Sequence, residues 1–275
     1  MSPEVAVVIV LYHQKIDQSP SYDCLQTAVQ AGKIELIIFD NSPVAHDDLL
    51  YSEKNVQYHH DPSNPGLAVA YNYAIDHVSD EVQTLVTLDQ DTEIDATYFE
   101  TVAQISWNKE QVAAVPMVFS GPRQISPVWA DQYINRHFEV IEEPVTTPRR
   151  IMAINSGAVF SLTFLREING YNTEFPLDFL DHWLFWQIKQ LNKQIVVLNT
   201  RMNHDLSVLD YKKVNVTRYQ SILTAESRFY QKYDQQHLAQ HRKQLVLRMA
   251  KQFLTVKNRQ IWRMTLRSFV ENWKV

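Results

Sequence analysis

Two carboxylates one residue apart, Asp89 and Asp91, directly follow the apolar run of residues 85–88. At the end of a buried strand such a pair offers hard oxygen ligands. These suit Mg²⁺ or Mn²⁺, which usually keep some waters and share the phosphate oxygens of a substrate. The motif therefore predicts a metal–diphosphate site. Because Asp-x-Asp is also common in surface turns, an ordinary turn stays open as the alternative interpretation of this motif alone.

A second polar cluster, Asp40-Asn41-Ser42, follows the apolar run of residues 36–39 in the same way. Ligands of α/β proteins bind beyond the carboxyl ends of the parallel strands. We therefore expect the two clusters to face one crevice. The alternative for Asp40 is a side chain that only forms the turn after its strand.

The elements that must position these clusters alternate along the chain. The continuous β-branched run of residues 5–11 is typical of a strand covered on both faces. The pattern predicts an α/β fold with a mixed, mainly parallel sheet flanked by helices. Gly157 lies inside an expected strand, where glycine allows a close approach of backbone or ligand. The expected strands cover residues 5–11, 36–39, 56–59, 85–88, 112–119, 152–162 and 195–198, and the expected helices cover 21–31, 67–75, 96–107, 163–168 and 181–191, with residues 120–148 irregular.

The composition is that of a globular protein. The 275 residues are 45% hydrophobic and 21% charged, enough for one large or two small domains. No apolar run approaches the ~18–20 residues that a membrane span needs, and the N-terminus lacks the basic region of a signal peptide. The single cysteine, Cys24, excludes an internal disulfide and a cysteine-rich metal site. We expect a cytoplasmic protein.

Charge is unevenly distributed along the chain. Residues 237–275 hold nine basic residues and one acidic residue, a net +8, whereas residues 1–236 hold 17 basic and 30 acidic residues, a net −13. Apolar residues recur in the basic segment at steps of three and four, which predicts amphipathic helix. It could pack on the rest of the protein, lie on an anionic membrane surface, or form a homodimer. No nucleic-acid partner is expected, because no recognised binding motif accompanies the charge.

A set of polar and glycine-containing markers follows the predicted elements along the chain. They are Leu11-Tyr12, Asp40-Asn41-Ser42, Asn64-Pro65-Gly66-Leu67-Ala68 with Asn72, Asp89-Gln90-Asp91, Asn155-Ser156-Gly157-Ala158, Asp178-x-x-Asp181 and His204. Their order resembles the family 2 glycosyltransferases of the GT-A fold, most closely the bacterial rhamnosyltransferase branch, over residues 5 to about 206. The resemblance implies a Rossmann-like GT-A catalytic domain over residues 1–206. The basic amphipathic tail lies outside the resemblance, and we expect residues 207–275 to form a helical extension.

The resemblance also implies roles for the matching residues. Asp40 would accept a hydrogen bond from the N3–H of uracil or thymine, since a carboxylate only accepts. Mn²⁺ or Mg²⁺ would be held by Asp89, Asp91 and His204, with Asp91 as the direct ligand. Asp89 would hold the ribose or a metal-bound water, and His204 would bind the metal or the diphosphate. An exposed, uninvolved His204 is the alternative. The residues expected to bind the nucleotide-sugar are Val10, Tyr12, Asp40, Asn41, Asn64, Gly66, Leu67, Asn72, Asp89 and Gln90.

The same resemblance makes Asp181 the expected catalytic base. An inverting transfer needs one carboxylate that takes the proton of the acceptor hydroxyl as that oxygen attacks the anomeric carbon. A plain helix N-cap is the alternative role of Asp181. The residues expected around the acceptor and the donor sugar are Gly157, Asp178, His182 and Trp183.

Two positions depart from the pattern of the relatives. These usually carry an acid two residues after the base and an arginine or lysine about six residues after it, where this chain has Trp183 and Gln187. The apolar run of residues 183–186 either lines an aromatic acceptor pocket or packs in the core. The departures affect the expected acceptor more than the donor chemistry, and they leave room for a weakened enzyme.

The expected activity is a metal-dependent, inverting transfer of a sugar, with rhamnose as the candidate, from a dTDP- or UDP-sugar. The acceptor would be a lipid-linked precursor of a cell-surface or exopolysaccharide, reached from the inner face of the cell membrane. A non-catalytic protein of this fold that binds a glycan or a partner is one alternative. A nucleotidyltransferase is another, but it would need a glycine-rich basic phosphate loop, and residues 11–20 hold no glycine and only Lys15.

Overall fold

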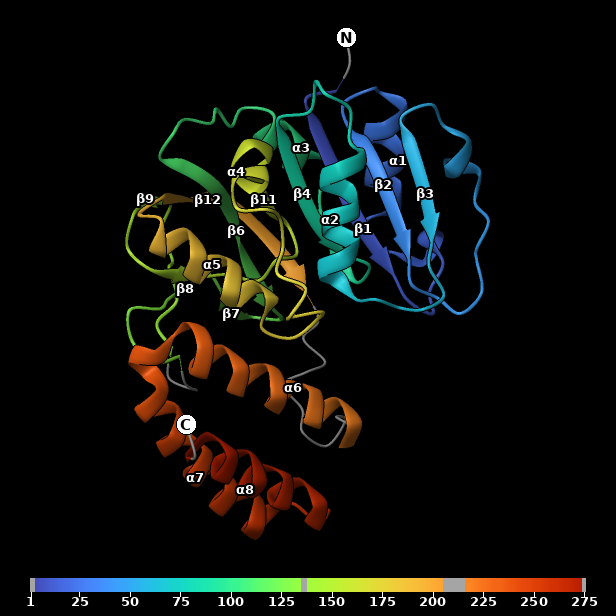
Figure 1. Cartoon of the computed structure of the whole chain (residues 1–275). Coiled ribbons are helices and arrows are strands. Elements are labelled where there is room, and N and C mark those ends of the chain that lie inside the picture. The colour runs from blue at the N-terminus through green and yellow to red at the C-terminus, as the bar shows by residue number, and fades with distance from the viewer. Residues whose placement is uncertain (1–2, 135–137, 205–215, 274–275) are drawn as a thin grey trace.

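The computed structural model describes residues 3–134, 138–204 and 216–273 (Figure 1). The strands are β1 (Val5–Leu11), β2 (Glu35–Asp40), β3 (Val56–His60), β4 (Thr84–Asp89), β5 (Thr92–Glu93), β6 (Gln111–Ser120), β7 (Arg123–Ser126), β8 (Val128–Trp129), β9 (Val145–Thr147), β10 (Ile151–Met152), β11 (Ala158–Ser161) and β12 (Gln194–His204). The helices are α1 (Tyr22–Gln30), α2 (Leu67–His77), α3 (Ala96–Val102), α4 (Leu162–Glu167), α5 (Leu180–Gln190), α6 (Val216–Arg228), α7 (Leu238–Thr255) and α8 (Arg259–Trp273), with short turns η1 (Ile16–Gln18), η2 (Leu49–Ser52), η4 (Phe229–Tyr233) and η5 (Gln235–His237).

Within the described residues, ten strands form one mixed sheet. Its main path is β3-β2-β1-β4-β11-β6-β12-β5. Strands β1 to β4 pair in parallel, and β11 runs antiparallel to both β4 and β6. Since β12 pairs in parallel with β6, the strands β1 to β4, β6 and β12 all point the same way. The mixed α/β fold with its mainly parallel central strands is therefore confirmed.

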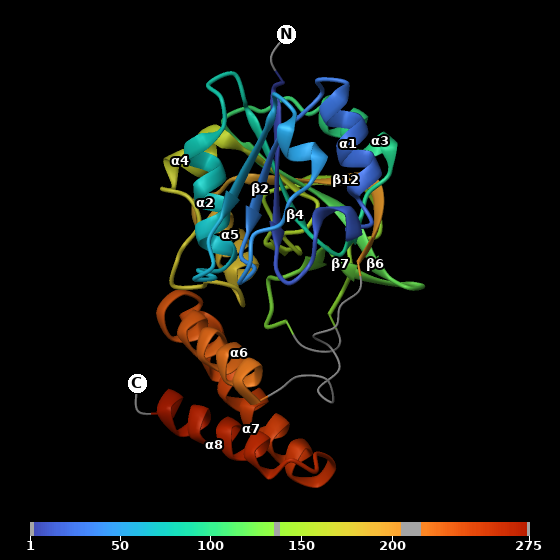
Figure 2. The same cartoon turned by 90° about the vertical axis from the view of Figure 1, so that its right-hand side faces the viewer.

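The sheet is covered on both faces, which explains the continuous apolar run of β1. Alternate residues of a strand face opposite sides. Ala6 and Val8 join the core under α2, α4 and α5, whereas Val7 and Ile9 join the core under α1 and α3. All four side chains are fully buried. Figure 2 shows the sheet nearly edge-on, with helices on either side.

Register brings the predicted polar clusters to one edge. Leu11 at the end of β1 lies opposite Asp40 of β2, and Val10 lies opposite Asp89 of β4. The carboxyl ends of β2 and β4 thus flank the end of β1. Both clusters therefore lie at the carboxyl ends of neighbouring strands, as expected, and their facing one crevice stays a prediction.

Several element boundaries differ from the predicted ones. The helix expected over residues 96–107 ends at Val102, and short strands β7 to β9 lie in the segment expected to be irregular. The strand expected over residues 152–162 is two strands, because the chain turns at Asn155-Ser156-Gly157, where Gly157 has a φ of +73°. The strand expected over residues 195–198 is much longer, since β12 extends to His204.

The C-terminal helical segment packs on the sheet-containing part of the chain through α6 and η4. Ala225, Phe229 and Tyr230 belong to the same core cluster as α2 and α5. Asp234 forms a buried ion pair with Arg150, Oδ2 to Nη2 2.7 Å. The predicted boundary at residues 206 and 207 lies outside the described residues. Within the described ranges, no helix combines the length and the hydropathy that crossing a membrane requires.

Helices α7 and α8 form a hairpin against α6. Leu245 of α7, Ile261 of α8 and Leu223 of α6 share a small core with Tyr219. Both views place the hairpin on the far side of α6 from the sheet (Figures 1 and 2). The amphipathic helices predicted for the basic segment are therefore present.

Candidate metal and nucleotide site

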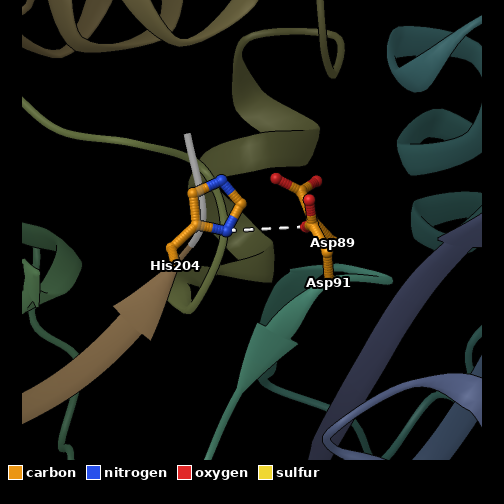
Figure 3. A group of neighbouring side chains, drawn as sticks. All are labelled: Asp89, Asp91 and His204. Atoms are coloured by element: carbon orange, nitrogen blue, oxygen red, sulfur yellow. Dashed lines mark ion pairs between the residues drawn. The ribbon is translucent and has the colours of Figure 1, made fainter. Parts of the chain in front are cut away.

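Asp89, Asp91 and His204 come together at the carboxyl edge of the sheet (Figure 3). One ligand atom from each lies within 4.8 Å of the others, and His204 Nδ1 is 3.5 Å from Asp91 Oδ1. The side chain of Asp91 is half exposed, whereas that of His204 is only 7% exposed. Two carboxylates and one imidazole, open on one side, are a donor set that fits Mn²⁺ or Mg²⁺.

Strand pairing holds His204 opposite the acidic loop. His204 ends β12 and pairs with Thr92 of the short strand β5, which follows Asp91 directly. Thr92 Oγ1 lies 2.8 Å from His204 Nδ1 and 2.6 Å from Ser156 Oγ, which in turn accepts a hydrogen bond from the Asp89 N–H at 2.8 Å. Groups that orient metal ligands in this way fix their geometry before the ion binds.

The electrostatics of Asp89 favour a bound cation. Burial raises the pKa of Asp89 to about 6, with further contributions from Asp91 and Asp181, although His204 and the Tyr71 hydroxyl oppose the shift. The charges of Asp91 and Asp181 therefore disfavour the ionised form of Asp89. A divalent cation between them would relieve that repulsion, so the residues present fit a metal.

Gln90 ties the acidic loop to the end of β1. Its Oε1 accepts from the Tyr12 N–H at 2.7 Å, and its Nε2 donates to the Tyr12 carbonyl at 3.2 Å. The Tyr12 side chain is 46% exposed, whereas Val10 is buried. Tyr12 and Gln90 thus lie next to the candidate metal ligands, and their contact with a nucleoside stays a prediction.

Asp40 is fully buried and already accepts hydrogen bonds within the protein. Its Oδ1 accepts from the Ser42 N–H at 2.9 Å and its Oδ2 accepts from the Tyr58 hydroxyl at 2.7 Å. Burial favours a higher pKa for Asp40, but these hydrogen bonds and His46 outweigh it, and the pKa is lowered. The hydrogen bond from the Ser42 N–H forms the turn that was the alternative interpretation of Asp40. Asn41 is also buried, and no donor among the described residues reaches its Oδ1. Base recognition by Asp40 stays a prediction.

The segment of Asn64 and Gly66 packs against the loop before α5. Gly66 precedes α2 with a φ of +95°, and a Cβ there would lie 2.3 Å from the Pro176 carbonyl oxygen. The Leu67 N–H donates to the same oxygen at 2.6 Å. This contact joins the expected nucleotide segment to the expected acceptor segment.

Asn72 holds α2 to the loop before α5 in a different way. Its Oδ1 accepts from the Tyr171 N–H at 2.6 Å and its Nδ2 donates to the Tyr171 carbonyl at 2.8 Å. Both polar atoms of the Asn72 side chain are thus used by backbone. In this structure Asn72 fixes the loop before α5 to helix α2. A direct contact of Asn72 with the nucleotide-sugar stays a prediction.

Asp181 lies in the first turn of α5 and does not cap it. The N-cap is Phe179, in left-handed conformation at φ 63°, and Asp181 Oδ1 accepts from the adjacent His182 N–H at 2.8 Å. The Asp181 charge also raises the pKa of Asp89, so the two carboxylates are neighbours. Asp181 is thus a half-buried carboxylate beside the candidate metal ligands, and it is not the N-cap of α5. Its role as catalytic base stays a prediction.

Asp178 and His182, both expected near the sugars, have different environments. Asp178 forms an ion pair with Arg218 of α6 at 2.7 Å and accepts from the Ser221 hydroxyl at 3.2 Å. His182 stacks on Phe179 with centroids 4.4 Å apart, and burial lowers its pKa.

Trp183 and Gly157 serve packing. Trp183 is only 7% exposed within the main core, which agrees with core packing of the apolar run. At Gly157 a Cβ would meet the Met202 sulfur at 2.3 Å, so glycine lets β12 approach the turn. A sugar contact by either residue stays a prediction.

Some residues of the site are not identified by the sequence. Thr92 carries no signal besides its place after Asp91, and Tyr71 has the pattern of an ordinary helix residue. Ser156 lies within the marker of residues 155–158, so its proximity to Gly157 could have identified it. Arg218 lies in the extension, outside the span of the resemblance.

Comparison with known proteins agrees with this geometry. No curated protein matches the chain. Crystal structures of S. aureus TarS residues 1–349, alone and in complex with UDP-GlcNAc, are similar with TM-scores of 0.55 and 0.60 and identities of 13% and 14%. Each match covers 99% of this chain and 81% of that one. The chain also aligns over its whole length with 54% of the longer TarS structure, at a TM-score of 0.52. At such identities the likeness shows the fold alone.

The family itself is shown by sequence. The profile described as Glycosyl transferase family 2 matches residues 7–168, which is more than half of the chain and includes Asp40, Asp89 and Asp91. The ordered acidic residues at the strand ends, their convergence with His204, and this match lead to one conclusion: the chain belongs to glycosyl transferase family 2 and has the GT-A fold.

Proposed function

We propose that this glycosyltransferase moves a sugar, with rhamnose as the candidate, from a UDP- or dTDP-linked donor onto a saccharide acceptor by an inverting, metal-dependent reaction. The observation that carries the proposal is the convergence of Asp89, Asp91 and His204 at one sheet edge, with Asp181 beside them. The complex of TarS with UDP-GlcNAc supports a uridine donor as the first one to test.

Asp91, Asp89 and His204 would hold Mn²⁺ or Mg²⁺, with Thr92 and Ser156 keeping the ligands in place. When bound there, the cation neutralises the charge that builds up on the departing nucleoside diphosphate. Asp89 contributes best as a carboxylate, so its raised pKa makes the site sensitive to acid.

Asp181 takes the proton of the acceptor hydroxyl while that oxygen attacks the anomeric carbon. The carbon–oxygen bond to the diphosphate breaks as the new glycosidic bond forms, and the configuration inverts. Asp178, held by Arg218 and Ser221, orients the acceptor beside the base. A carboxylate accepts hydroxyl hydrogen bonds strongly, which suits this role.

The nucleoside would lie against the ends of β1 and β2. Tyr12 and Gln90 flank it, and the buried Asn41 Oδ1 offers an acceptor. Asp40 would recognise the N3–H of uracil or thymine, for which it must release the Tyr58 hydroxyl or share its oxygens. The acceptor would be a lipid-linked precursor of a cell-surface or exopolysaccharide, met at the inner face of the cell membrane.

The test is release of nucleoside diphosphate from a panel of nucleotide-sugars with Mn²⁺. Wild type should release UDP or dTDP from at least one donor, and EDTA should stop the release. Asp91→Ala should lower the rate by at least about a hundredfold, since one of few metal ligands is lost. Glu93→Ala, two residues further on and also exposed, is the matched control and should retain activity. Equal rates in Asp91→Ala and wild type would reject the site. Binding without release, for every donor and acceptor, would favour a non-catalytic protein of this fold.

A further inference from the structure

The outward surface of the α7–α8 hairpin is unusually apolar. Of the eleven exposed large hydrophobic side chains in the described residues, six lie on these two helices. Leu254 is 80% exposed, Leu247 53% and Phe253 51%. Spacings of seven on α7 and four on α8 keep the side chains of each helix on one face. The outer face, as we name it, comprises Val246, Leu247, Phe253 and Leu254 of α7 with Leu266 and Val270 of α8.

Cations surround these apolar side chains. Arg259 lies over the Phe253 ring at 5.1 Å, and Phe253 meets Trp262 edge-on with centroids 5.4 Å apart. The sequence of residues 238–273 has Glu271 as its single acid, and Glu271 pairs with Arg267. The exposed basic residues of the hairpin are Lys243, Lys251, Lys257, Arg259, Arg263 and Arg267.

The inner face of the hairpin is fixed by a polar network, so the outer face cannot simply rotate inward. Gln252 Nε2 donates to the Tyr219 hydroxyl at 2.6 Å, and Gln252 Oε1 accepts from Thr265 at 2.7 Å. Thr265 and Leu245 are fully buried. Satisfied buried hydrogen bonds of this kind specify one packing. The apolar outer face is thus a consequence of the fold.

We propose that the outer face binds the surface of an anionic lipid bilayer. Leucine and phenylalanine side chains beside a basic rim are the composition of interfacial membrane helices. Each exposed cation is attracted to anionic headgroups. A symmetric dimer through this face is disfavoured, because an isologous contact would bring the same cations of two copies together. Charge complementarity therefore favours lipid over a second copy.

This inference deepens the proposed function, because it gives a lipid-linked acceptor a surface near the enzyme. The lipid-binding inference rests on the proposed function only for the role of the bound lipid surface, since lipid binding needs neither donor nor metal. An experiment can therefore reject lipid binding and sugar transfer independently of each other.

The test is co-sedimentation of the full chain with vesicles of phosphatidylcholine alone or with phosphatidylglycerol. The protein should bind the anionic vesicles, and added salt should weaken the binding because it screens the cations. The double variant Phe253→Ser/Leu254→Ser should lower the partition coefficient by at least about tenfold, since two side chains can no longer insert. Lys251→Gln/Lys257→Gln should lower it comparably.

Matched controls lie on the catalytic domain. Val44 is 73% exposed and Leu49 is 89% exposed, so Val44→Ser/Leu49→Ser removes similar apolar surface and should leave vesicle binding unchanged. Far-UV circular dichroism should be equal in all these variants, which verifies that they fold whether or not the chain turns over a donor, and donor hydrolysis should be equal as well. Equal binding to neutral vesicles, or no effect of the Phe253 and Leu254 changes, would overturn the proposal. So would a concentration-dependent dimer that these changes abolish in a protein that binds no vesicles.

Discussion

His241 on α7 makes the stability of the protein dependent on pH. Its side chain is fully buried, stacks on Tyr230 with centroids 4.6 Å apart, and has its Nδ1 3.6 Å from Glu226 Oε1. Burial lowers the pKa of His241 from 6.5 to about 4, and the nearby Arg248 and Arg242 add to this, although Glu226 opposes it. The folded protein therefore keeps this imidazole neutral where the unfolded chain protonates it.

The direction and magnitude of this pH dependence of the free energy of unfolding follow from proton linkage. A lowered histidine pKa means that the unfolded state binds more protons between pH 6.5 and about 4, so the contribution of His241 to stability is complete above this window and falls as the pH decreases through it. For His241 alone, the loss between about pH 7.5 and about pH 5 is about 2 kcal/mol. His182, whose pKa is also lowered by burial, adds in the same direction. Asp89 acts in the opposite direction, because its pKa is raised to about 6 and the folded protein therefore binds more protons there; the His241 contribution is consequently the difference between wild type and a variant without this imidazole.

Urea unfolding at these two pH values measures the difference in the free energy of unfolding. His241→Phe keeps a ring on Tyr230 but cannot take up a proton, so the change in its free energy of unfolding between the two pH values should differ from that of wild type by about 2 kcal/mol. Tyr133→Phe, which alters the hydroxyl 3.4 Å from His241 Nδ1 and retains the imidazole, is the control and should keep the dependence. A His241→Phe protein as pH-dependent as wild type would refute the reasoning. Staying above pH 5 avoids the titration of Glu226, whose pKa is lowered.

Three further predictions concern the site and its support. Asp181→Asn should leave the Kd for UDP or dTDP unchanged by calorimetry but slow sugar transfer by about a hundredfold or more, because the general base is lost; retained transfer would exclude Asp181 as the base. Asp234→Asn should lower the free energy of unfolding in urea by about 3–5 kcal/mol, since it leaves the buried Arg150 charge unpaired; a loss below about 1 kcal/mol would mean that water screens the pair. Gly66→Ala should lower the free energy of unfolding by more than about 1 kcal/mol and slow sugar transfer as well, because the added Cβ would collide with the Pro176 carbonyl oxygen. Unchanged stability and transfer would show that the Pro176 loop can move away without cost.

The sheet edge is predictable from the sequence because the signals there are local. β-branched runs specify strands, and a polar cluster after such a run marks a carboxyl end. These two signals suffice to place Asp40 and Asp89 at one edge. His204 is harder to place, since the periodicity ends its strand at residue 198. The continuation of β12 to residue 204 depends on pairing with β6 and β5, which local sequence does not encode.

Residues that act through distant contacts could not be predicted. Asn72 carries an amide that fits a ligand contact equally well, yet it bonds the backbone 99 positions away. Ser156 and Thr92 contact the candidate metal ligands only because a turn near residue 156 lies against the loop after β4. Such pairings follow from topology, so periodicity and motif spacing do not predict them.

The C-terminal extension contacts the proposed acceptor site and also carries the proposed lipid-binding surface. Asp178 and Asp181 are close enough that each adds to the local negative charge, and burial raises the pKa of Asp178. Arg218 of α6, 2.7 Å away, opposes this shift, although the pKa of Asp178 stays raised. The cation that favours the ionised form of Asp178 thus comes from the C-terminal segment rather than from the part that matches the family profile. The same helix packs Leu223 against the hairpin that carries the outer face. One element therefore contacts the proposed acceptor site on one side and supports the proposed lipid-binding surface on the other, an arrangement that suits an enzyme whose acceptor is attached to a membrane lipid.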